Sequence, residues 1–141
     1  IYKIQVHLKI IEENYSFLKA FGQAKLADIM FTYALARRLE GKGIHAYSLD
    51  PGGVKNNTLK NAEDVPALMK FRYKLTYPFL KSPYQGSETL VYLATADELS
   101  GVTGEYFMDQ KPDKSAPQSY DKEKQEKLWE ISNQLTGENF P

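Results

Sequence analysis

The fold of this 141-residue chain is constrained most by one long helical segment and the short strand that follows it. From Ala20 to Glu40, apolar residues recur at helical spacing, and two arginines near the end complement the negative pole of the helix dipole. Gly41 and Gly43 can adopt the left-handed conformation that ends a helix. Ile44 to Leu49 is then predicted to be a short strand that runs into a glycine-rich break. This order is typical of a parallel α/β sheet.

The other segments continue this alternation of helix and strand. Before the long helix, we predict a strand over 1–8 and a polar lead-in over 9–19. After the short strand, we predict an irregular helical pair over 57–82 that Pro66 and Pro78 interrupt, and then a helix opened by Ser82 and Pro83. A strand over 105–109, a loop over 111–120 and an amphipathic helix from Asp121 to Gly137 follow. Period-two alternation favours the first strand, proline suits the first turn of a helix, and aspartate caps one. The predicted buried stripe of the last helix comprises Leu128, Trp129, Ile131, Ser132 and Leu135.

Composition excludes several classes of function. Lysine plus arginine equals aspartate plus glutamate at 18 each, which leaves no basic excess for nucleic acid. The chain has no cysteine and only two histidines, without the spacing of a metal site, so we expect no metal. It has no apolar run long enough for a transmembrane helix and no signal peptide. We expect a cytoplasmic or membrane-associated intracellular protein, and the start in mid-strand without methionine suggests a fragment or a processed product.

Residues 15–27 place Phe21 and Lys25 on one face of the long helix, because side chains four residues apart are neighbours there. Other short pieces follow in order: 34–39 (ALARRL), 51–54 (PGGV), 86–94, 104–107 (GEYF) and 127–132 (KLWEIS). No piece is specific by itself. In their joint order and spacing, over roughly residues 15–137, they resemble the short-chain dehydrogenase/reductase family, and in particular its retinol dehydrogenase-like branch.

This resemblance implies a fold and a reaction. The chain would form the C-terminal part of a Rossmann-like, doubly wound parallel sheet, as one partial domain over residues 1–141. Residues 1–14 would be a divergent lead-in strand and loop, and residues 57–82 would be the region of a substrate lid. The implied reaction transfers a hydride between NADP or NAD and a hydrophobic alcohol or carbonyl compound.

The site residues of the family carry over position by position. In the family, a tyrosine hydroxyl exchanges a proton with the substrate oxygen, and a lysine four residues later lowers the pKa of that tyrosine and binds the nicotinamide ribose. Lys25 stands at the lysine position, whereas Phe21 stands at the tyrosine position and has no hydroxyl. The implied cofactor-binding residues are Lys25, Pro51, Gly52, Gly53, Val54 and Asn56. The family's serine on the preceding strand is absent, and we interpret His7 there as part of the polar face of that strand.

Three hypotheses about function stay open. The first is an NAD(P)-dependent oxidoreductase that is impaired by Phe21 and by the absence of the N-terminal cofactor-binding half. The second is an inactive binding or dimerisation module that forms a homo-oligomer through the helix over 20–40. The third is a fragment without a function of its own. For the basic and aromatic stretch 65–80 we favour a lid or simple packing over membrane contact, because Pro66 and Pro78 break any long amphipathic helix.

Overall fold

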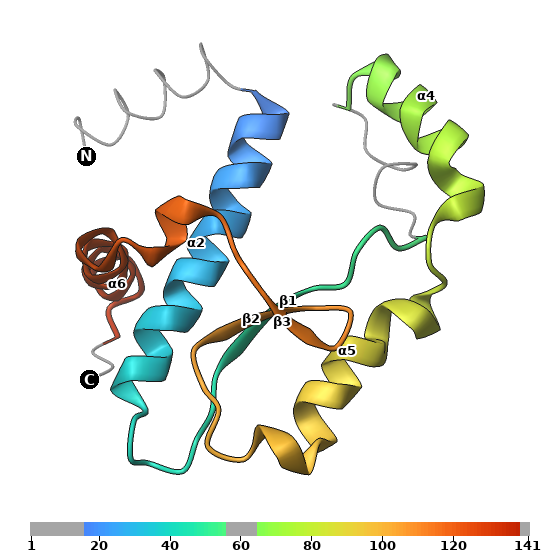
Figure 1. Cartoon of the computed structure of the whole chain (residues 1–141). Coiled ribbons are helices and arrows are strands. Elements are labelled where there is room, and N and C mark those ends of the chain that lie inside the picture. The colour runs from blue at the N-terminus through green and yellow to red at the C-terminus, as the bar shows by residue number, and fades with distance from the viewer. Residues whose placement is uncertain (1–15, 56–64, 139–141) are drawn as a thin grey trace, which may run out of the picture.

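The computed structural model describes residues 16–55 and 65–138. Its elements follow one another as α2 (Phe17–Arg38), β1 (Tyr47–Asp50), α4 (Ala67–Thr76), η1 (Tyr77–Phe79), α5 (Pro83–Thr95), η2 (Asp97–Leu99), β2 (Glu105–Met108), β3 (Lys111–Asp113), η3 (Pro117–Tyr120) and α6 (Lys122–Thr136). The strand predicted over 1–8 lies outside the described residues. In Figure 1, α2 and α6 lie on one side of the sheet and α5 lies on the other.

The three strands form a mixed sheet in the order β1-β2-β3. β1 runs parallel to β2, with Ser48 opposite Tyr106 and Leu49 opposite Phe107. A long connection through α4 and α5 joins these two strands, as parallel pairing requires. The prediction of an α/β class with helices between parallel strands is therefore confirmed for the described residues.

The prediction of a continuous loop over 111–120 is wrong. β3 pairs antiparallel with β2, and η3 occupies the end of the same stretch. The two-residue turn between the strands places Asp109 and Gln110 at φ 49° and 61°. This conformation at both turn positions favours a tight hairpin, and asparagine or glycine usually marks it in a sequence. Neither residue is present here, so the sequence carries no hairpin signal.

α2 forms the core of the described structure. Its buried residues are Met30, Tyr33, Ala34 and Ala36, and Leu39 at its C-cap is buried as well. The helix begins at Phe17, three residues before the prediction, and ends at Arg38. The following strand also begins later than predicted, at Tyr47, because the glycine-containing turn after α2 extends to Ala46, whose N–H binds Thr103 Oγ1 at 3.0 Å.

α6 packs against α2 through one aromatic side chain and one carboxylate. Trp129 stacks on Phe31 with ring centroids 4.9 Å apart, and the Arg38 guanidinium lies 4.2 Å from the Trp129 ring centroid. Glu126 accepts hydrogen bonds from Arg38 and from Arg37, the latter at 2.7 Å. These bonds hold the pKa of Glu126 well below its usual range, at about 2, so the ion pairs persist at neutral pH.

The predicted caps of α6 are confirmed, but its predicted buried stripe is partly wrong. Asp121 accepts the Lys124 N–H at 3.1 Å, and Gly137 closes the helix with φ 74°. Trp129 is buried as predicted, whereas Ile131 and Leu135 are exposed. Gln125 is buried instead, because Arg37 and the Ser119 carbonyl satisfy both ends of its amide. Apolar periodicity does not reveal a buried polar residue of this kind.

The stretch around α4 also differs from the predicted irregular pair of helices. Pro66 stands directly before α4 and Pro78 lies in the following turn η1, so the two prolines bound one regular helix within the described residues. The helix predicted to open at Ser82 is confirmed. Ser82 and Gln85 form a reciprocal capping box with bonds of 3.2 and 2.9 Å. Within 16–55 and 65–138, no helix combines the length and apolarity needed to cross a bilayer.

We predict opposite effects on stability for alanine at two helical glycines. A Cβ at Gly86 would come within 2.5 Å of Val54 Cγ2, and valine cannot rotate freely away from it. Gly86→Ala should therefore lower the free energy of unfolding by about 1–3 kcal/mol. Gly22, in α2, has open space around its Cβ position, so Gly22→Ala should raise it by about 0.5–1 kcal/mol. Urea denaturation measures both, and equal effects would contradict the packing of α5 on Val54.

Candidate functional site

A cleft of about 830 Å³ opens between the N-terminal half of α2 and the carboxyl end of β1. Parallel strands commonly bind ligands beyond their carboxyl ends. The residues lining it are Phe21, Lys25, Asp28, Ile29 and Thr32 from α2, together with Tyr47 to Gly53 and Tyr106. The structure thus gathers most of the residues singled out in the sequence around one concave surface.

Phe21 and Lys25 lie one helical turn apart and both are exposed toward this region. The Lys25 Nζ binds Asp28 Oδ2 at 2.9 Å. Such an exposed pair at a spacing of three residues contributes no more than about 0.5 kcal/mol. Lys25 can therefore leave Asp28 at little cost when another acceptor enters the cleft. Asp28 itself was not predicted as a site residue.

The turn after β1 is held in shape by hydrogen bonds from its own aspartate and from a distant lysine. Gly52 has φ 75°, a left-handed conformation that favours glycine, and its N–H binds Asp50 Oδ1 at 2.7 Å. Lys81 bonds to the same turn through its main chain, with its N–H 2.9 Å from the Gly53 oxygen and its own carbonyl accepting the Lys55 N–H at 2.9 Å.

The side chain of Lys81 adds a second set of contacts. Its Nζ donates to the Pro51 oxygen at 3.3 Å and forms an ion pair with Asp109 beyond the end of β2. Lys81 thus links the turn after β1 to the turn after β2. Sequence reasoning missed this residue, because a contact across 28–30 residues leaves no local pattern.

One member of the predicted cofactor set, Val54, does not line the cleft, and another lies outside the described residues. The Val54 side chain packs against Gly86 of α5, and Val54 pairs with Lys81 in an isolated parallel bridge. Its structural role is therefore to fasten the turn to α5. Asn56 lies outside the described residues. Lys25, Pro51, Gly52 and Gly53 line the cleft together with Phe21.

The strand residues at the cleft contribute two hydroxyl groups that were not predicted. Ser48 Oγ is buried without a hydrogen-bond partner among the described residues. Tyr106 lies opposite Ser48 on β2, and burial, followed by the negative charges of Asp50 and Asp113, raises the pKa of its phenol. Tyr106 therefore keeps its proton at neutral pH and can donate a hydrogen bond. The alternation of side chains along the predicted strand 105–109 could have indicated that Tyr106 and Phe107 point to opposite faces of the sheet.

A second cavity, of about 650 Å³, lies at the other end of α2. It is lined by Tyr33, Arg37, His45, Tyr120 and Gln125, among others, and contains none of the predicted site residues. His45 is exposed, just before β1, rather than inside a strand. No cluster of three potential metal ligands occurs in the part of the chain that the structure describes.

Comparison with known proteins identifies the relatives of the chain. No protein-family model matches it. Retinol dehydrogenase 14 of Homo sapiens is 38% identical over 127 residues, which cover 89% of this chain and 38% of that protein. Retinol dehydrogenase 12 of Mus musculus is 35% identical over 135 residues, covering 96% of this chain and 42% of that protein. This chain is a homologue of the retinol dehydrogenases.

The predicted resemblance to the retinol dehydrogenase-like branch of the short-chain dehydrogenase/reductase family is thereby confirmed. Polyprenol dehydrogenase of Homo sapiens is a further relative, 37% identical over 125 residues that cover 87% of this chain and 37% of that protein. The chain thus spans about two fifths of the length of the curated relatives it matches.

We predict that removing the Lys81 ammonium loosens the turn after β1. Lys81→Met should increase amide hydrogen exchange over Asp50 to Lys55 several-fold, because the contacts to Pro51 and Asp109 are lost while the main-chain bonds stay. Lys81→Arg should largely restore protection. Lys74→Met, at an exposed position of α4, serves as the matched control. Unchanged exchange in Lys81→Met would show that the main chain alone fixes the turn.

Proposed function

We propose that this chain is the nicotinamide-side part of an NAD(P)-dependent oxidoreductase that acts on a hydrophobic alcohol or carbonyl compound. The observation that carries the proposal is the convergence of Lys25 and the Pro51–Gly53 turn on one cleft beyond the end of β1. The homology to retinol dehydrogenases supports this assignment. The single partial domain over 1–141, with a lid over 57–82, is part of the same proposal.

The residues around the cleft fit the nicotinamide half of such a cofactor. Ser48 Oγ is a buried polar atom without a partner among the described residues, and the exposed Lys25 forms an exposed ion pair with Asp28. A Cβ at Gly53 would come within 2.8 Å of Leu80, so the turn keeps a bare main chain there. Lys25 would hold a ribose hydroxyl, and the turn would hold the carboxamide. Bound NAD(P) would supply the hydride acceptor or donor.

Among the described residues, we assign no site to the phosphates of the adenine half. The sequence contains no Gly-x-Gly-x-x-Gly motif of the kind that binds pyrophosphate at a helix N-terminus. The choice between NAD and NADP depends on residues near that half. We therefore propose weak cofactor binding by the chain alone, through the nicotinamide side only.

The proton-transfer step is the one most affected by the residues present. Phe21 lines the cleft at the position of the family's tyrosine and has no proton to exchange. Loss of a positioned acid or base typically lowers the rate by about 10²–10⁴-fold. Tyr106 shares the cleft, but its raised pKa makes it a hydrogen-bond donor rather than a base. Impaired turnover is therefore part of the proposal.

The proposed substrate class follows from the lining of the cleft and from the relatives. Phe21, Ile29 and Leu49 give the cleft an apolar wall that suits a hydrocarbon chain or ring. The relatives are named for retinol and polyprenol. Both are long apolar alcohols, so a hydrophobic alcohol or its carbonyl partner is the class we propose.

The doubly wound sheet remains a proposal beyond the three strands described. One edge of β1 pairs with β2, and no strand within 16–55 or 65–138 pairs with its other edge. Helices on both faces of the β1–β2 pair suit a parallel sheet that continues from this edge. We propose that further parallel strands extend the sheet there.

A second candidate is an inactive module that self-associates through the helix over 20–40. Phe21 is 56% exposed on that helix, where an aromatic side chain without a catalytic role favours contact with another apolar surface. In this alternative, the chain would form a homo-oligomer and no substitution in the cleft would produce turnover.

Phe21→Tyr tests the proposed chemistry directly. Restoring the hydroxyl next to Lys25 should raise NADPH-dependent reduction of a long-chain aldehyde by about 10²-fold, and adding Lys25→Met should remove the gain. Phe31→Tyr, on the same helix but outside the cleft, is the matched control and should change nothing. No turnover in Phe21→Tyr, together with no thermal shift at millimolar NADPH, would contradict the proposal for this chain.

A further inference from the structure

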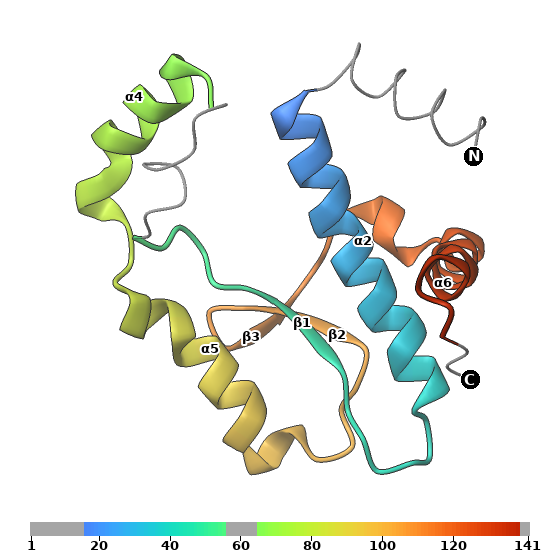
Figure 2. The same ribbon diagram turned by 180° about the vertical axis from the view of Figure 1, so that it is seen from behind.

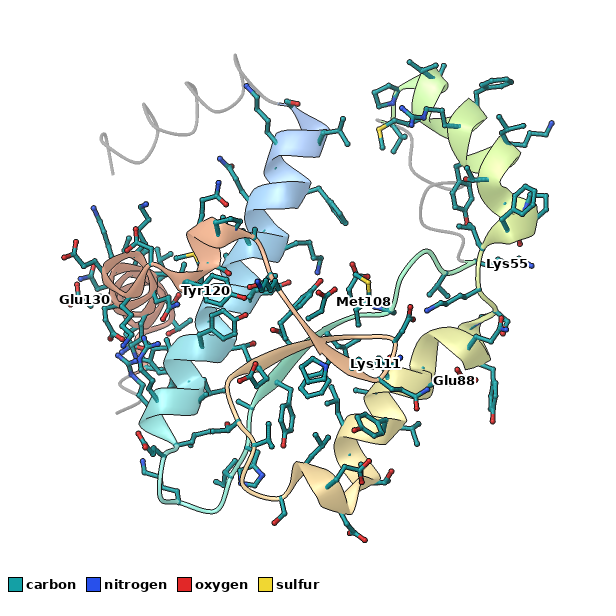
Figure 3. The ribbon with its side chains drawn as sticks, viewed as in Figure 1. Lys55, Glu88, Met108, Lys111, Tyr120 and Glu130 are labelled. Carbon is teal, nitrogen blue, oxygen red and sulfur yellow. The ribbon has the colours of Figure 1, made fainter. Side chains whose placement is uncertain are left out.

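α4 packs little against the rest of the described structure. None of its ten residues is buried. The side chains of Leu68, Phe71 and Leu75 are 69%, 64% and 66% exposed, and Phe79 in the next turn is 89% exposed. Figures 1 and 2 show α4 standing apart from α2 and from the sheet, and the side chains of α4 meet neither of them in Figure 3. The apolar side chains of α4 are therefore largely uncovered by the rest of the described residues.

The apolar side chains of α4 form a narrow stripe. At about 100° per residue, Leu68, Phe71 and Leu75 fall within an arc of about 60°, which we call the α4 stripe. Arg72 lies about 70° to one side of the centre of this arc and Lys74 about 90° to the other. Long cationic side chains in these places can extend sideways while the stripe is buried in an apolar layer.

The charge of this region has one sign. Between Val65 and Ser82 the chain carries Lys70, Arg72, Lys74 and Lys81 and no acidic residue, although the whole chain is neutral. Lys81 is paired with Asp109, whereas the ion pairs of the described residues involve neither Arg72 nor Lys74. A partner for this face must therefore be apolar at its centre and negative at its rim.

We propose that α4 docks on a bilayer surface that contains anionic lipid, with the α4 stripe in the interfacial layer. A helix with a basic flank and an apolar stripe lies in the plane of such a surface. Pro66 and Pro78 do not prevent this, because they bound the helix instead of breaking it. The inference goes beyond the proposed function and does not depend on cofactor binding.

The lipid must be anionic for the contact to hold. Three side chains and Phe79 make a small apolar contact, and a single modest hydrophobic anchor binds membranes only marginally and reversibly. Each basic residue near an anionic leaflet adds to binding, and salt screens this attraction within about 10 Å at moderate ionic strength. Binding should therefore require both the apolar contact of the α4 stripe and the attraction between the basic residues and anionic lipid.

Vesicle flotation of the full chain tests the inference. The chain should float with vesicles of phosphatidylcholine and phosphatidylserine, and the bound fraction should fall by about tenfold with phosphatidylcholine alone. A comparable fall is expected when salt rises from about 0.1 M to about 1 M. No flotation with anionic vesicles, or equal flotation with both compositions, would overturn the inference.

Paired variants locate the contact. Phe71→Ser with Leu75→Ser should lower binding by about tenfold, whereas Leu90→Ser with Val91→Ser on α5, at residues 59% and 55% exposed, should not. These exposed positions leave folding intact, which circular dichroism verifies. If the two pairs behave alike, α4 is not the contact.

Two further experiments test the role of the basic residues and the possibility that a second copy of the chain covers the α4 stripe. Arg72→Gln with Lys74→Gln should abolish the preference for anionic vesicles, and the exposed control pair Lys111→Gln with Lys114→Gln should keep it. Size-exclusion chromatography with light scattering tests the alternative occupant. A dimer that Phe71→Ser disrupts, without lipid binding, would show that a second copy covers the stripe and would overturn the proposal.

Discussion

The close approach of α2 to the start of β2 is the contact on which the rest of the described structure depends. Ala36 is buried at this contact, and a Cβ at Gly104 would lie 3.1 Å from the Ala36 Cβ. Larger residues at Ala36 or Gly104 would push the helix away from the sheet. The main-chain bond from Gly104 to Ala46, at 2.8 Å, ties the same point to the approach of β1. This contact sets the position of Phe21 and Lys25 beside the end of β1.

The sequence predicted those helices and caps that depend on residues close to one another in the chain. The periodicity of α2, the Ser82 cap of α5 and the Asp121 cap of α6 all depend on neighbouring residues, and all three are confirmed. The hairpin to β3 and the burial of Gln125 were missed, because the first lacks its usual turn residues and the second depends on Arg37 from another element. Helix spacing likewise predicted that Phe21 and Lys25 share one face of α2, whereas the roles of Lys81 and Tyr106 depend on contacts made only in the folded chain.

The cleft beyond β1 and the α4 stripe would bind their ligands through different interactions. The cleft beyond β1 is formed by one face of α2 and one hydrogen-bonded turn, and we propose that it binds the nicotinamide side of a cofactor. α4 offers no such enclosure, since its residues are exposed and its cations flank an apolar stripe. The two proposals concern separate parts of the molecule, and each is tested separately.

We propose that this chain binds the nicotinamide side of a dinucleotide cofactor and not its adenine side. Saturation-transfer NMR with nicotinamide mononucleotide and, separately, with 5′-AMP tests it most directly. We expect transfer to the nicotinamide ring protons, loss of that transfer in Lys25→Met, and no transfer to 5′-AMP. Equal transfer to both ligands, or transfer to nicotinamide mononucleotide that Lys25→Met leaves unchanged, would contradict it.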